Sequence, residues 1–173
     1  MAENLLVGVI GHRNSGKSET WYRLFGQKVR TSQNRPRPLY LSEDEYVEVV
    51  LVNGSPEERG ASVEDILKGD SPRIVLCSMQ YRPGVQETLN YFEERGYQFY
   101  IQWLNPGYRD ASGYADHLGL TRRLSRGSSI FLVRNGREPT DKRVGEIRDF
   151  IASWAGSRNL ILRVTDLALA VPQ

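Results

Sequence analysis

The sequence contains a single cysteine, Cys77, and only two histidines. One cysteine cannot form an internal disulfide, which fits the reducing cytosol, so we expect a cytoplasmic location. The two histidines and one cysteine also leave no credible zinc cluster. Because Cys77 lies in an apolar segment, we expect its thiol to be buried and inert.

Long hydrophobic runs and an excess of one charge are also missing. No run of 18 apolar residues is present, so we expect no membrane span. Residues 1–4 carry no positive charge ahead of the apolar residues 5–10, so we expect no secretory signal. The formal net charge of +2, with arginines interleaved among acidic residues, gives no strong nucleic-acid signal.

The length of 173 residues suits one domain spanning 1–173. Apolar stretches that end at turn signals alternate with segments of helical periodicity, which predicts an α/β sheet. The expected strands are 5–10, 38–41, 46–52, 73–78, 97–104, 129–134 and 160–164. The expected helices are 18–25, 62–68, 84–95, 111–118 and 140–154, with loops at 31–38 and 53–60.

Most strands of this sheet should be parallel, with one antiparallel hairpin. Only residues 42–45 separate the strands 38–41 and 46–52. A parallel pair would need a crossover of about a dozen residues or more, so these two strands should be antiparallel neighbours.

The segment after the first apolar run fits the pattern GxxxxGK(S/T) without a mismatch. Its residues are Gly11, His12, Arg13, Asn14, Ser15, Gly16, Lys17 and Ser18. The glycines let the backbone turn tightly and approach phosphate groups with no Cβ in the way. Lys17 would place its ammonium on the β- and γ-phosphates, and Ser18 would offer its hydroxyl to Mg²⁺. Chance alone produces such a match in roughly one of 200 chains of this length.

This motif, with the strand before it and the helix after it, resembles the P-loop NTPase superfamily. The resemblance implies a three-layer α/β sandwich that binds a nucleoside triphosphate, ATP or GTP, together with Mg²⁺. It also implies that all the motif residues bind the nucleotide, that Lys17 is catalytic and that Ser18 is a metal ligand. His12 occupies a variable position of the motif, and we expect it to face solvent.

The element order is similar to that of Ras-like small GTPases, in which a switch loop and a strand pair follow the first helix. Thr31 or Ser32 would then occupy the first switch loop, and Thr31 would be a second metal ligand. Where that family has DxxG, this chain has Asn53-Gly54-Ser55-Pro56. Where it has NKxD, the chain has Asn105 and Asp110 at a wider spacing. We therefore expect no strong guanine preference and only slow hydrolysis.

A nucleotide or small-molecule kinase is an alternative. Arg82 and Gln86 match two positions of the adenylate kinase segment DGxPRxxxQ, with Ser78 where that family has an acid. An arginine-rich segment that could form a lid or supply an arginine finger contains Arg122, Arg123 and Arg126. The same arginines also fit a solvated basic loop.

A second alternative is a module that binds nucleotide without turnover, because neither candidate Walker B position carries an acid. Acidic substitutes are available in Glu48, Glu57 and Glu58. The aromatic residues that could stack on the base are Tyr81, Tyr108 and Tyr114, and the sequence does not choose among them. The function that we expect is Mg²⁺-dependent triphosphate binding with slow hydrolysis.

Overall fold

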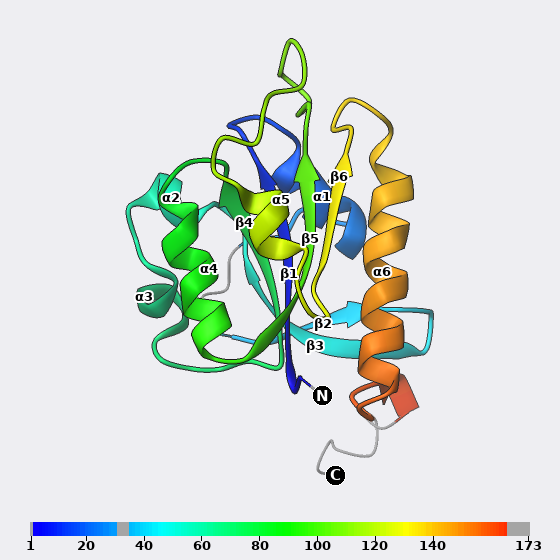
Figure 1. Cartoon of the computed structure of the whole chain (residues 1–173). Helices are drawn as coiled ribbons and strands as arrows, with labels where there is room; N and C mark the ends of the chain where they lie inside the picture. Colours follow the sequence, from blue (N-terminus) through cyan, green and yellow to red (C-terminus); the bar gives the residue numbers. More distant parts are fainter. Residues whose placement is uncertain (1, 31–34, 166–173) are drawn as a thin grey trace.

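The computed structural model describes residues 2–30 and 35–165 (Figure 1). Strands alternate with helices over these ranges, as the alternating sequence pattern predicts. The elements in chain order are β1 (Asn4–Gly11), α1 (Lys17–Phe25), β2 (Arg37–Tyr40), β3 (Glu45–Val52), α2 (Pro56–Arg59), α3 (Val63–Leu67), β4 (Ile74–Gln80), α4 (Val85–Glu94), β5 (Tyr97–Leu104), α5 (Leu120–Leu124), β6 (Ile130–Arg134), α6 (Thr140–Gly156) and β7 (Leu162–Arg163).

The sheet is mostly parallel, with the strand order β2-β3-β4-β1-β5-β6. β1 lies in the middle and pairs in parallel with β4 and β5, and the pairs β3–β4 and β5–β6 are parallel as well. β2 and β3 are antiparallel, with Arg37 opposite Val49 and Tyr40 opposite Tyr46, so the expected hairpin is confirmed. The short strand β7 adds antiparallel to the start of β3.

Helices cover both faces of this sheet, so the molecule has three layers (Figure 1). One core joins α1 and α6 to one face through Trp21, Leu24, Ile147 and Ile151. The other core joins α3, α4 and α5 to the opposite face. Alternate residues of β1 enter the two cores, and all its side chains from Leu5 to Ile10 are buried. Such two-sided burial explains the uninterrupted apolar sequence of β1.

The prediction of a helix at 111–118 is wrong. That segment is irregular, and the helix begins later, at Leu120. Asp116 explains the difference, because its carboxylate accepts hydrogen bonds from the backbone N–H groups of Leu120 (3.0 Å) and Thr121 (2.7 Å). The residue therefore caps the start of α5 instead of lying inside a helix.

Smaller differences occur at two other places. The segment expected as a loop at 53–60 contains the four-residue helix α2, whose first residue is Pro56. The last strand is limited to Leu162–Arg163. The remaining expected strands and helices are present, with ends that shift by one or two residues, and part of the expected loop at 31–38 lies outside the described residues.

Candidate functional site

The residues of the glycine loop, defined as Gly11 to Ser18, connect the end of β1 to the first turn of α1. Gly16 caps this helix with a φ of 107°, a left-handed conformation that a side chain with a Cβ rarely adopts. The loop therefore brings the first N–H groups of α1 to the carboxyl edge of the sheet. Unpaired N–H groups and the helix dipole make such a helix start a favourable place for an anion.

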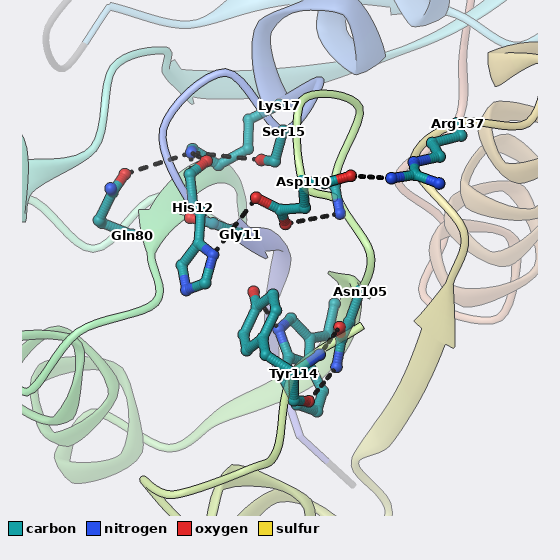
Figure 2. A network of polar contacts seen from close by, with 11 residues as sticks. Gly11, His12, Ser15, Lys17, Gln80, Asn105, Asp110, Tyr114 and Arg137 are labelled. Carbon is teal, nitrogen blue, oxygen red and sulfur yellow. Dashed lines mark hydrogen bonds and ion pairs between the residues drawn. The ribbon is translucent and has the colours of Figure 1, made fainter. Parts of the chain in front are cut away.

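Lys17 turns back into the curve of the glycine loop (Figure 2). Its Nζ donates hydrogen bonds to the backbone carbonyls of Gly11 (3.1 Å) and His12 (2.7 Å) and to Gln80 Oε1 (3.3 Å). The residue is only 8% exposed. Burial lowers the pKa of the Lys17 ammonium, while Glu58 and other nearby carboxylates act against this shift. A desolvated cation therefore stands at the loop and interacts with neutral oxygen atoms.

The second helical residue, Ser18, contacts the end of β3. Its hydroxyl donates to Asn53 Oδ1 at 3.0 Å, and the Asn53 amide donates to the carbonyl of Val29 at 3.1 Å. The structure thus brings together Ser18 and Asn53. The other expected metal ligand, Thr31, lies outside the described residues, as does Ser32.

A pocket of about 780 Å³ opens over the glycine loop. One end is lined by Asn14 to Ser18 with Gly54, Ser55 and Glu58, and the other by the loops that follow β5 and β6. The residues lining this second end include Tyr108, Arg109, Gly136, Arg137, Glu138 and Pro139. Sites of this kind form at the carboxyl ends of strands in open α/β sheets.

The loops after β5 and β6 pack directly on the glycine loop. Tyr108 donates its backbone N–H to the carbonyl of Ser15 (2.9 Å), and Gly136 donates to the carbonyl of Pro106 (2.7 Å). A Cβ on Gly107 would lie 2.4 Å from Cβ of Ser15, and a Cβ on Gly136 would lie 2.8 Å from the Ser15 carbonyl oxygen. Only glycine permits such approaches, so the three loops behave as one packed unit.

Replacing Gly136 with alanine is expected to destabilise this unit by about 1–3 kcal/mol, because the new methyl group overpacks backbone atoms. Gly145→Ala is the matched control, since nothing lies within 4 Å of a Cβ at that position of α6. That variant should gain about 0.5–1 kcal/mol from helix propensity. Urea unfolding measures both changes, and a Gly136→Ala protein as stable as the wild type would contradict the packing argument.

Asn105 and Asp110, which the sequence comparison set beside the NKxD pattern of small GTPases, contact neighbouring protein groups (Figure 2). Asn105 exchanges hydrogen bonds with the backbone of Tyr114, at 2.8 and 2.9 Å. Asp110 Oδ2 accepts from the N–H of Gly107 (2.8 Å), and its Oδ1 lies 3.5 Å from Nδ1 of His12. Both side chains stabilise the loop after β5.

The expectation that His12 faces solvent is wrong in part. Its side chain is 38% exposed, and its ring stacks on Tyr114 with 3.8 Å between centroids. Tyr81 is buried, and its hydroxyl donates to Asp116 at 2.5 Å. Tyr108 differs from both, because it lines the pocket and is 63% exposed. Of the three tyrosines, Tyr108 alone lines this pocket.

The residues that suggested a kinase lie outside the lining of the pocket over the glycine loop. Arg82 donates to the backbone carbonyl of Glu57 (2.6 Å), and Gln86 to that of Leu118 (3.1 Å). Arg123 joins α5 to α4 through Glu93 at 2.9 Å. Neither these residues nor Arg122 and Arg126 are among those that line the pocket over the glycine loop. The arginines at 122–126 therefore match the solvated and structural interpretation rather than a lid.

The three acids that could substitute for a Walker B acid, Glu48, Glu57 and Glu58, differ in position. Glu58 lines the pocket. Glu57 is held by hydrogen bonds from the backbone N–H of Gln80 (3.0 Å) and the hydroxyl of Thr88 (2.6 Å). Glu48 is opposite Pro38 within the hairpin and is exposed. Of these three acids, Glu58 alone lines the pocket over the glycine loop.

Three residues of the site were not predicted from the sequence. Gln80 follows a buried parallel strand, and the rule that ligands bind at carboxyl ends of strands could have identified it. Gly136 could have been found in the same way, as it follows β6. Arg143 gave no signal, because its neighbours in the sequence are typical of a solvated helix.

Comparisons of the chain with protein-family models, with curated proteins and with solved structures returned no match. Within residues 2–30 and 35–165, no helix combines the length and the hydropathy needed to cross a bilayer. The chemistry of the pocket over the glycine loop is therefore the basis for assigning a function.

Proposed function

We propose that the chain binds a nucleoside triphosphate with Mg²⁺ in the pocket over the glycine loop and hydrolyses it slowly. One observation carries this proposal: the desolvated ammonium of Lys17 and the N-terminus of α1 meet at one loop. Both features favour a multiply charged anion. The remaining pocket extends to the exposed Tyr108, whose aromatic ring suits a nucleoside attached to that anion.

Lys17 has partners that a phosphate can replace. Its ammonium now donates to two backbone carbonyls, which are neutral acceptors. Phosphate oxygens accept stronger, charge-assisted hydrogen bonds. On binding, the ammonium would leave the carbonyls for the β- and γ-phosphates, and N–H groups of the loop would donate to the same anion.

Ser18 and Asn53 fit one Mg²⁺. Both offer oxygen atoms, the ligand type that Mg²⁺ prefers, and these atoms lie 3.0 Å apart. Because neither residue carries a charge, the phosphates would have to supply most of the neutralisation of the ion. The ion would offset charge on the β- and γ-phosphates.

Slow turnover follows from the residues at the phosphate end. Glu58 lines the pocket, and Gln80 contacts Lys17 from the end of β4, so either could orient an attacking water. Asn53 replaces the acid that usually supports the metal, which favours weak catalysis. The same replacement supports the alternative of a module that binds without turnover, whereas the positions of Arg82, Gln86 and Arg123 do not support a kinase.

The decisive experiment measures binding of ATP and GTP to the full chain, with and without Mg²⁺, followed by release of phosphate. Binding with slow phosphate release supports the hydrolase. Binding without release supports the module, and transfer only after an acceptor is added would favour the kinase. Failure of both nucleotides to bind would contradict the proposal.

The affinities for ATP and GTP are expected to agree within about tenfold, or roughly 1.4 kcal/mol. Discrimination between bases needs a buried group that pairs with one base edge and not the other. Asn105 bonds to the backbone of Tyr114, and Asp110 contacts Gly107 and His12, so neither offers such an edge. Competition against a labelled triphosphate measures the ratio. A hundredfold preference for GTP that disappears in Asp110→Ala would contradict this interpretation of the loop.

A further inference from the structure

Arg143 is a buried cation at the pocket over the glycine loop. It lies in α6 and is only 4% exposed. Its guanidinium faces the first turn of α1, where Nη2 lies 3.4 Å from the carbonyl oxygen of Gly16 and Nη1 donates to the hydroxyl of Thr20. The residue is also among those that line the pocket. Its position is therefore fixed by α1, and the pocket is within its reach.

In the part of the chain that the structure describes, no acid is paired directly with the guanidinium of Arg143. Among the described residues it forms no ion pair, and its Nε has no hydrogen-bond partner. Glu19 is the carboxylate that influences it, but that group is paired with Arg23 at 2.9 Å. Burial lowers the pKa of the Arg143 guanidinium to about 10. An unpaired buried charge costs free energy that an apolar side chain would avoid.

Lys17 and Arg143 approach the start of α1 from different directions. Lys17 points toward the end of β4, where Gln80 accepts its hydrogen bond. Arg143 comes from α6, which begins directly after the loop that lines the Tyr108 end of the pocket. In a nucleotide bound with its base at Tyr108, the lysine would lie toward the far phosphates and the arginine toward the nucleoside.

We propose that Arg143 is a second phosphate-binding cation, which contacts the phosphate nearest the nucleoside. This inference rests on the proposed function and adds to it that Lys17 and Arg143 bind different phosphates. A diphosphate would keep its contact with Arg143 after the terminal phosphate has gone, so the site would hold the product of hydrolysis as well as the substrate.

Arg143→Met tests this inference, because methionine keeps much of the length of the side chain and removes the charge. The variant should bind ADP and ATP about tenfold or more weakly, by a similar factor for both. Lys17→Ala should weaken ATP binding more than ADP binding. Urea unfolding of the nucleotide-free Arg143→Met protein should show equal or higher stability, because the desolvated charge is gone. A purely structural arginine would give the opposite change in stability.

Two further variants complete the design. Lys142→Met removes the same charge at the exposed neighbouring residue and should leave both affinities unchanged. Arg143→Lys should recover part of the lost affinity, since it restores a cation. If folded Arg143→Met binds ATP within twofold of the wild type while Lys17→Ala does not bind it, the inference is overturned and the proposed function stands. If the wild type binds neither ATP nor GTP, the proposed function fails as well.

Discussion

Replacing Lys17 with alanine is expected to abolish triphosphate binding without unfolding the chain. The ammonium would make charge-assisted hydrogen bonds to two phosphates, and each such bond is worth about 1.5–3 kcal/mol. Losing both weakens binding by at least a hundredfold on this scale. In the nucleotide-free protein the same ammonium is desolvated and pairs only with neutral groups, so its removal costs the fold little. Calorimetric titration with ATP and GTP measures the loss.

Lys142→Ala is the control for this experiment, because it changes the net charge equally at an exposed position of α6. It should bind both nucleotides like the wild type. Circular dichroism and a urea titration establish that Lys17→Ala is folded. Unchanged nucleotide affinity in a folded Lys17→Ala protein would remove the phosphate site from the glycine loop.

Trp21→Ala should have the largest effect on stability. The indole belongs to α1, is completely buried, and donates through Nε1 to Ser78 Oγ at 2.8 Å. Its removal leaves a cavity between α1 and the sheet and is expected to cost about 3–5 kcal/mol, a large share of the roughly 5–15 kcal/mol of a typical domain. Since α1 supports the glycine loop, nucleotide affinity should fall in parallel.

Tyr22→Ala provides the comparison, because Tyr22 is the next residue of the same helix and is only partly buried. Tyr22→Ala should lower the free energy of unfolding clearly less than Trp21→Ala does. Urea titrations of both variants give the two values. A loss below about 1 kcal/mol for Trp21→Ala would show that α1 is held by something other than this packing.

The parts of the fold that the sequence predicts are those governed by local pattern. β1 is recognisable because an uninterrupted apolar run is typical of a strand buried on both faces. The hairpin follows from the short connection between its strands, and Ser62 caps α3 as expected, accepting from the N–H of Asp65 at 3.1 Å. The glycine loop follows from the fixed positions of its motif.

Tertiary contacts decided the features that the sequence could not predict. Residues 111–118 have helical character, but Asn105 accepts from the N–H of Tyr114, and Asp116 accepts from the N–H of Leu120 at the start of α5, so the segment is irregular. The order of the strands, with β4 between β1 and β3, depends on pairing across long separations and leaves no local signal. Arg143 is functional in our proposal only because α6 packs on α1, which no pattern near residue 143 reveals.

The pairing of β7 with β3 has a consequence for synthesis of the chain on the ribosome. β3 pairs with β4 through residues 50–52, whereas its first residues, Glu45 and Tyr46, pair with Arg163 and Leu162. β7 follows every other strand of this sheet in the chain, so during synthesis the edge of Glu45 and Tyr46 that faces β7 lacks its partner while the other strands pair. Open strand edges are sites of aggregation in partly folded chains. The nascent protein is therefore most prone to misassembly at its β2–β3 hairpin, far from the glycine loop, until β7 pairs with β3.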